Sequence, residues 1–219
     1  MSEKTDLPPT DRTRLRRLRE RGDFSLQTIY AILDAMPLCH IAYLGERGPV
    51  CVPTLQWREG NHVYWHGSSA SRAIRAAADH DVCLTVSLLD GFVLARSAFH
   101  HSVNFRSAMI FGRPTLVDDP ERKLARLKAF IDGLYPGRWD TLRPIDGREA
   151  KATAVLGMPI DEASAKVRTG PPVDDEEDYT LPIWAGVVPV EMRLMNPEPD
   201  PRNLPGLDAP EHATSLKIG

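Results

Sequence analysis

The feature that most constrains the fold is a succession of short apolar runs separated by turn residues. Between residues 38 and 68 the chain reads LCHIAYL, GERG, PVCVPTLQWR, EGN and HVYWHG. Runs of this length with short Gly-containing turns between them predict antiparallel strands joined by tight hairpins. The pattern returns in DVCLTVSLL, FVLARSAF and VNFRSAMIFGRPTLV, and again in ATAVLGMPI and PIWAGVVPVEMRL. We therefore expect a mainly β protein, a small antiparallel barrel of six or seven short strands with peripheral helices.

Three segments carry a helical pattern instead. FSLQTIYAILDAMP places apolar residues at helical spacing between Ser25, a suitable N-cap, and Pro37, which ends the helix. SSASRAIRAAADH is rich in alanine and interrupts the strands. DDPERKLARLKAFIDGLYPG is the clearest helix, with Asp119 as its cap and Pro120 at its first position. Strands and crossover helices do not alternate, so a doubly wound parallel sheet is excluded.

The 219 residues contain no internal repeat, and we expect one domain. Its predicted limits are residues 25–195. A flexible, polar N-terminal arm is expected over residues 1–24, and an extended tail rich in Pro and Asp over residues 196–219.

Composition excludes several classes of function. The formal net charge is −3, and the basic run RTRLRRLRERGD is mixed with acidic residues, so we expect no nucleic-acid partner. Cys39, Cys51 and Cys83 are odd in number and lack CxxC spacing, which predicts buried free thiols and neither a disulfide framework nor a zinc site. No apolar stretch approaches the roughly 20 residues that span a bilayer. We expect a cytoplasmic protein with no membrane partner.

The junction VYWHGSSASRAIRAAA is the most informative stretch for chemistry. A strand ends there, and Ser68 and Ser71 precede Arg72 in the first turn of a helix. Hydroxyl groups, free backbone N–H groups and a guanidinium at a helix N-terminus favour phosphate binding. A serine-capped helix with a surface arginine has the same pattern. The residues by themselves leave both interpretations open.

Longer motifs resemble a known family. HIAYLGERGPVCVPTLQWREGNHVYWHGSSASR resembles the front half of the FMN-binding split-barrel proteins, the superfamily of pyridoxamine 5'-phosphate oxidase. LDGFVLARSAFHHSVNFRSAMIFGRPTLVDDPERKL, and SAKVRTGPPVDDEED with WAGVVPV, resemble its flavin-nucleotide-binding branch, to which the nitroimidazole-resistance reductases are related. The resemblance covers about residues 25–189. It implies a six-stranded Greek-key split barrel that forms a homodimer, with FMN at the subunit interface.

The resemblance also assigns site residues. It places the FMN phosphate at Ser68, Ser71 and Arg72, and the isoalloxazine ring along residues 53–55. Ser107 stands where the oxidases have a flavin-contacting glutamine. Trp184 matches a cofactor-side tryptophan but lacks the arginine that follows it in the oxidases, so oxidation of pyridoxine phosphate is not expected. The cofactor-binding residues expected in full are Pro53, Thr54, Leu55, His66, Ser68, Ser71, Arg72, Arg106, Ser107 and Trp184.

The histidines are weighed separately, because histidine is the usual acid–base group near neutral pH. His66 and His101 are the candidate catalytic residues, although a strand-end histidine bonded only to backbone is the more common arrangement. His100 and His101 are adjacent and would point to opposite faces of a strand. His62 and His66 share a face but lie about 13 Å apart by strand rise. We therefore expect no metal ion held by histidine pairs.

Motifs of other enzyme classes, such as GxSxG and GxxxxGK[ST], are absent from the sequence. We expect an FMN-dependent oxidoreductase acting on a small aromatic, heteroaromatic or nitro-substituted substrate, with NAD(P)H as a possible electron donor. Two alternatives remain open. One is a flavin storage or sensing module without turnover. The other is the same fold holding haem or a deazaflavin, with a histidine as axial ligand.

Overall fold

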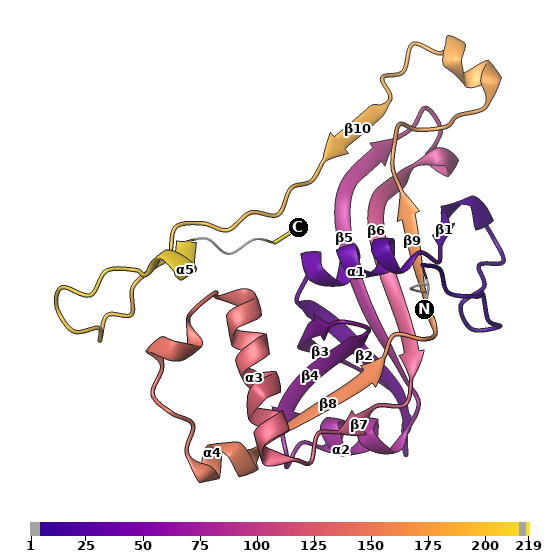
Figure 1. The fold of residues 1–219 in the computed structure, drawn as a ribbon. Helices are drawn as coiled ribbons and strands as arrows, with labels where there is room; N and C mark the ends of the chain where they lie inside the picture. Colours follow the sequence, from indigo (N-terminus) through magenta and orange to yellow (C-terminus); the bar gives the residue numbers. More distant parts are fainter. Residues whose placement is uncertain (1–4, 215–217) are drawn as a thin grey trace.

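The computed structural model describes residues 5–214 and 218–219, and its architecture is mainly β (Figure 1). Ten strands form one sheet in the order β1-β9-β6-β5-β2-β3-β4-β8-β7, with β10 added to β5. Every pairing between these strands is antiparallel, and the sheet does not close, which confirms the predicted fold class. The strands are β1 (Gly22–Asp23), β2 (Leu38–Gly45), β3 (Gly48–Glu59), β4 (His62–Ser68), β5 (Val82–Leu94), β6 (Ser102–Gly112), β7 (Thr115–Leu116), β8 (Thr153–Pro159), β9 (Ala163–Arg168) and β10 (Gly186–Pro189).

Tight turns join β2 to β3 and β3 to β4, as predicted. Gly45 pairs with Gly48, and Glu59 pairs with His62, so each connection is short. Gly48 and Gly60 have φ values of 115° and 56°, in the left-handed region where glycine carries no steric penalty. The turn residues thus fix the register of the three strands that carry the candidate site.

The three predicted helices are present as α1 (Leu26–Ala35), α2 (Arg72–Asp79) and α3 (Pro120–Leu134). Asp119 caps α3 by accepting a 2.7 Å hydrogen bond from the Arg122 amide, whereas Ser25 occupies the N-cap of α1 without a side-chain bond. Two short helices were not predicted, α4 (Gly147–Ala152) and α5 (Glu211–Thr214). None of the helices in the described ranges is long and apolar enough to cross a membrane.

Two apolar clusters lie on opposite faces of the sheet. The larger one packs α1 against the inner face, and its fully buried members include Ile29, Ile41, Trp65, Leu84 and Ile110. The smaller one packs α3 against β3, β4 and β8, and its buried members are Trp57, Tyr64, Leu127, Phe130 and Val155. Each buried side chain of this size contributes roughly 1.5–3 kcal/mol of transfer free energy. Strand β4 is therefore covered on both faces.

The two chain ends both return to the barrel. Leu7 is buried in the larger cluster, and Arg12 donates hydrogen bonds to Asp81 at 3.1 Å and to Glu162. The described part of the expected N-terminal arm thus packs on the sheet. At the other end, Gly219 donates a 2.9 Å hydrogen bond to the Ala35 carbonyl. The division of the chain at residues 25 and 195 stays a prediction.

Strand β10 lies against the far end of β5, beyond the barrel (Figure 1). It approaches at Gly91, where the register between β5 and β6 shifts. A Cβ atom added to Gly91 would stand 3.0 Å from the Val188 carbonyl oxygen and 3.0 Å from Val187 Cγ1. The close approach of β10 therefore depends on a residue without a side chain at this position.

Candidate functional site

The strand alternation of β4 directs His66 toward helix α3. Val63 and Trp65 are buried in the larger cluster, so Tyr64 and His66 face the opposite side. The imidazole centroid lies 4.9 Å from the Phe130 ring and 6.1 Å from the Trp57 ring. The sequence of one strand thus places a histidine among aromatic side chains between the sheet and α3.

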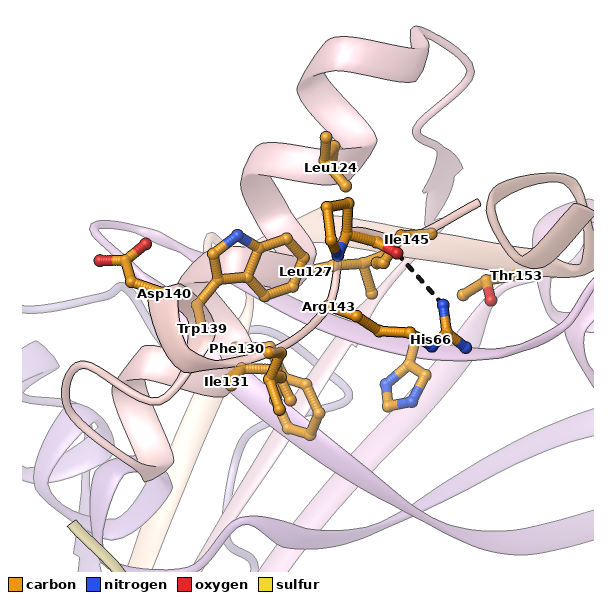
Figure 2. Close-up of a pocket in the computed structure, with 12 residues that line it drawn as sticks. His66, Leu124, Leu127, Phe130, Ile131, Trp139, Asp140, Arg143, Ile145 and Thr153 are labelled. Atoms are coloured by element: carbon orange, nitrogen blue, oxygen red, sulfur yellow. Dashed lines mark hydrogen bonds between the residues drawn. The ribbon is translucent and has the colours of Figure 1, made fainter. Parts of the chain in front are cut away.

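A cavity of about 500 Å³ opens beside His66. Figure 2 shows its walls, which come from α3, from the segment that follows α3, and from the start of β8. Most of the lining side chains are apolar or aromatic. The lining residues are His66, Leu124, Leu127, Phe130, Ile131, Trp139, Asp140, Leu142, Arg143, Pro144, Ile145 and Thr153. Volume and lining are those of a small-molecule or cofactor site.

His66 carries an unsatisfied group. Its Nδ1 atom is buried and has no hydrogen-bond partner in the part of the chain that the structure describes. Burial lowers the pKa of His66, which keeps the ring neutral at neutral pH. A buried polar atom without a partner costs roughly 1–3 kcal/mol. A neutral imidazole in an apolar cavity is also the form that ligates a metal.

Arg143 contributes a positive charge to this cavity. It donates a 2.9 Å hydrogen bond to Glu149 and a 3.1 Å hydrogen bond to the Pro144 carbonyl, the latter dashed in Figure 2. The pairing with Arg143, together with the Asp146 amide, lowers the pKa of Glu149 to about 2. The Arg143 side chain remains 70% exposed. Its guanidinium is thus accessible to a ligand carboxylate.

The predicted phosphate-binding residues come together where β4 ends and α2 begins, close to His66 in the chain. Ser71 is the N-cap of α2, yet its hydroxyl makes no capping bond, and its amide donates to the Ser68 carbonyl at 2.9 Å. Arg72 is exposed, and no carboxylate pairs with it among the side chains that the structure describes, which exclude that of residue 79. A hydroxyl, a guanidinium and the start of a helix thus remain available to an anion.

The predicted ring-binding residues lie on one open face of the sheet. Residues that pair directly across strands share a face. The pairs that define this face are Leu38–Leu55, His40–Pro53, His40–Thr85, Thr85–Met109 and Ser87–Ser107. Pro53 and Ser107 therefore face the same side, although their strands are separated by three strand spacings, about 14 Å in total. Thr54 lies between them and β4, and its hydroxyl donates to the His66 carbonyl at 3.5 Å.

Arg106 and Ser107, which we assigned together to the cofactor, lie on opposite faces of strand β6. Asn104 and Ala108 are buried, so Arg106 belongs to the inner set and Ser107 to the open face. The Arg106 guanidinium is held by Asp90 of β5, with an Nη2–Oδ1 distance of 2.7 Å. The Ser107 hydroxyl donates only a long hydrogen bond, 3.4 Å, to the Lys166 carbonyl. Ser107 is thus free for a ligand, whereas Arg106 already has a carboxylate partner.

His101 and Trp184 are not brought to these residues within one subunit. Both lie near the end of β5 where β10 pairs, whereas Arg72 belongs to α2, which leads into the start of β5 (Figure 1). Thirteen residues of β5 span about 43 Å. His101 Nδ1 contacts the Ser97 carbonyl at 2.8 Å, and Trp184 is 68% exposed. Their assigned roles stay predictions.

Sequence reasoning missed the residues that enclose His66. Leu127 and Phe130 were seen only as part of a helix, and Trp139 and Arg143 were not singled out. One signal was available in the sequence, because the segment of α3 carries apolar residues on a broad face. In the structure Leu124, which belongs to that face, stays 43% exposed. Among the described residues, no group of three His, Cys, Asp or Glu side chains is placed to hold a bare metal ion.

Comparison with known proteins defines the class. The family model for pyridoxamine 5'-phosphate oxidase matches residues 25–167. A 5-nitroimidazole antibiotic resistance candidate from Bacteroides thetaiotaomicron shares the fold at 22% identity, with a TM-score of 0.56 over 67% of this chain and 86% of that one. The chain thus has the split-barrel fold and belongs to the pyridoxamine 5'-phosphate oxidase family.

Two solved structures are more similar. The flavocytochrome Anf3 from Azotobacter vinelandii is 50% identical, with a TM-score of 0.94 over 97% of this chain and 100% of that one. The FAD- and haem-binding protein from Mycobacterium smegmatis is 32% identical, with a TM-score of 0.86 over 90% of this chain and 98% of that one. A search of the curated protein sequences finds no match.

Proposed function

We propose that this protein is an oxidoreductase that binds both a flavin nucleotide and haem. The observation that carries the proposal is the unpartnered, buried Nδ1 of His66 beside an apolar cavity of about 500 Å³. Two proteins similar over nine-tenths or more of the chain are named as a flavocytochrome and as an FAD- and haem-binding protein, which supports the same pair of cofactors here.

The cavity residues fit haem in three ways. His66 is the candidate axial ligand, because burial keeps its imidazole neutral. Leu127 and Phe130 would exclude water from the flat apolar faces of the ligand. Arg143 would pair with a carboxylate side chain of haem in exchange for part of its bonding to Glu149. When bound, haem supplies one-electron chemistry that no side chain provides.

The flavin would lie outside this cavity, on the open sheet face. The Ser71 hydroxyl and the Arg72 guanidinium would hold its phosphate, while Pro53 and Ser107 would contact the ring system. The sequence favours FMN, whereas the M. smegmatis relative is named for FAD. Chromatography of the flavin extracted with acid separates the two.

A second copy of the chain is proposed as the partner at this face. Leu38, Leu89 and Met109 are each at least 40% exposed there, and an apolar face of this kind is more often an interface than a solvent surface. The expected donor and acceptor, NAD(P)H and a small aromatic or nitro-substituted compound, would reach the flavin between two such faces. A flavin storage module is the second candidate, and steady-state NAD(P)H oxidation distinguishes the two functions.

The test is the absorption spectrum of the full chain after expression with a haem precursor. Flavin bands near ~370 and ~450 nm together with an intense band near ~400 nm are expected for the two cofactors. A flavin spectrum without haem, after attempted reconstitution with hemin, would refute the haem assignment and leave a flavoprotein. Binding of haem without flavin would refute the assignment of the open face.

A further inference from the structure

The segment from residue 191 to residue 210, here called the C-terminal strap, lies almost entirely in solvent. Every residue in it is exposed. Its backbone hydrogen bonds are local, such as the 2.9 Å bond from the Asn203 amide to the Asp200 carbonyl. In Figure 1 the strap runs away from the barrel beyond β10 and returns past α3. It therefore takes little of its shape from its own barrel.

Both ends of the strap are nevertheless fixed. Before it, the Val190 amide donates to the Asp90 carbonyl at 3.1 Å, which continues the pairing of β10 with β5. After it, His212 contacts Arg138 at 3.4 Å, and Ile218 packs against the larger apolar cluster. The strap is thus a loop anchored at two places and not a free tail.

The side chains of the strap are those of an interface. Leu204 is 73% exposed, Leu207 60% and Met195 74%, and Met192 and Leu194 are also exposed. Leucine and methionine at this exposure on an unsupported segment gain nothing in solvent, whereas burial of each removes its apolar surface from water and is favourable. The strap therefore offers apolar anchors to a surface outside its own subunit.

The similarity to the A. vinelandii protein indicates that the course of the strap is maintained. That structure superposes with a TM-score of 0.94 over 97% of this chain, a share that cannot be reached without most of the strap. Ordering a backbone costs conformational entropy at every residue, so a segment without supporting contacts would not keep one course in two proteins. Something present in both cases holds it.

We infer that the strap packs on a second copy of this chain. A second copy is the partner proposed above for the open face, and it brings its own exposed apolar side chains, which include Leu38 and Met109. A two-fold related pair would exchange two straps at once. The inference rests on the self-association proposed above, but it concerns neither cofactor, and the spectrum of the protein does not test it.

Hydrogen exchange of the full chain at several concentrations tests the inference. Sedimentation first gives the concentration range in which the protein dissociates. Amides of residues 191–210 are expected to exchange slowly above this range and at free-peptide rates below it. Free-peptide exchange in a proven dimer would overturn the strap inference while the dimer stands. Protection that persists in the monomer would overturn it as well, because the strap would then pack on its own subunit.

A pair of matched variants gives a second test. L204D together with L207D should weaken self-association at least tenfold, because two apolar anchors are replaced by charges. R202Q together with N203D changes the net charge by the same amount in the same segment and should leave association within about threefold of wild type. Equal effects of the two pairs, or no effect of either, would contradict the inference. Thermal unfolding under dilute conditions checks that all four substitutions leave the monomer folded.

Discussion

The His66 cavity and the open sheet face differ in how far a single chain encloses them. The cavity is enclosed by one chain, and its unsatisfied atom is a buried ring nitrogen. The open face and the adjoining start of α2 leave Ser71, Arg72 and Ser107 accessible, with apolar side chains around them. One site is complete in a single subunit, whereas the other has only one wall.

Because of this difference, we expect substitutions in the two sites to affect ligand binding differently. A buried site depends on packing, so changes there remove the ligand altogether. An exposed site depends on individual charge-assisted contacts, each worth about 1.5–3 kcal/mol, so changes there weaken binding in steps. The predictions below use this contrast, from the largest expected effect to the smallest.

The largest effect is expected from His66→Ala. Removal of the only imidazole that lines the cavity should abolish the band near ~400 nm and leave the flavin bands unchanged. His62→Ala is the matched control, since it removes a histidine from the same strand that lines a different cavity. Haem retained at wild-type affinity by His66→Ala, measured by hemin titration, would show that the axial ligand lies elsewhere.

The next largest effect is expected from Ser107→Leu. A leucine on the open face should block the flavin by its volume, while the haem cavity, which is lined from β4, α3 and β8, is unaffected. Ser107→Ala is the control and should cost no more than about tenfold in affinity, since a hydroxyl contributes about 0.5–1.5 kcal/mol. Fluorescence titration with FMN measures both variants. Wild-type FMN affinity in Ser107→Leu would place the ring away from β6.

Arg72→Ala should have an intermediate effect. Loss of one charge-assisted contact to phosphate corresponds to about 1.5–3 kcal/mol, roughly a ten- to hundredfold weaker affinity for FMN. Riboflavin has no phosphate, so its affinity should hardly change. Arg47→Ala, in the exposed turn between β2 and β3, controls for the change in net charge. If FMN and riboflavin lose affinity equally, Arg72 supports the fold and not the phosphate.

The smallest effect is a change in thiol labelling rates. Burial raises the pKa of Cys39 to about 12, so this thiol should stay unreactive at pH 8 until the protein unfolds. The predicted burial of the thiols is wrong for Cys51, which is exposed on the open face and should react in the monomer. Its labelling should slow several-fold as association covers the face. Mass spectrometry of the labelled peptides, at concentrations on both sides of dissociation, measures the two rates.

Local sequence determined much of the fold. The turns at Gly48 and Gly60 and the cap at Asp119 depend on neighbouring residues, and the predicted hairpins and helix were confirmed there. In β6 the two faces differ as strand geometry requires, because Asn104 and Ala108 are buried on one of them. The helix α4 was missed although Asp146 and Glu149 form a capping box, since the short segment lacks an apolar periodicity.

The candidate site was less accessible from sequence. Ser68, Ser71 and Arg72 lie within five residues of one another in the chain, so their convergence could be anticipated. The enclosure of His66 by Phe130, Trp139 and Arg143 depends on how a loop folds back across α3, which no local pattern specifies. Strand alternation is enough to place Arg106 and Ser107 on opposite faces. The ion pair between Arg106 and Asp90 could not be predicted without the register of β5 and β6.

The missing side chain at Gly91 has a consequence for the evolution of this architecture. Any other residue there would press on the backbone of β10, and the strap follows β10. A lineage that replaced Gly91 would lose the route by which its C-terminal extension leaves the barrel, and selection would no longer maintain the apolar residues beyond it. Glycine at this position and leucines at 204 and 207 should therefore appear and disappear together among relatives, as an inherited unit.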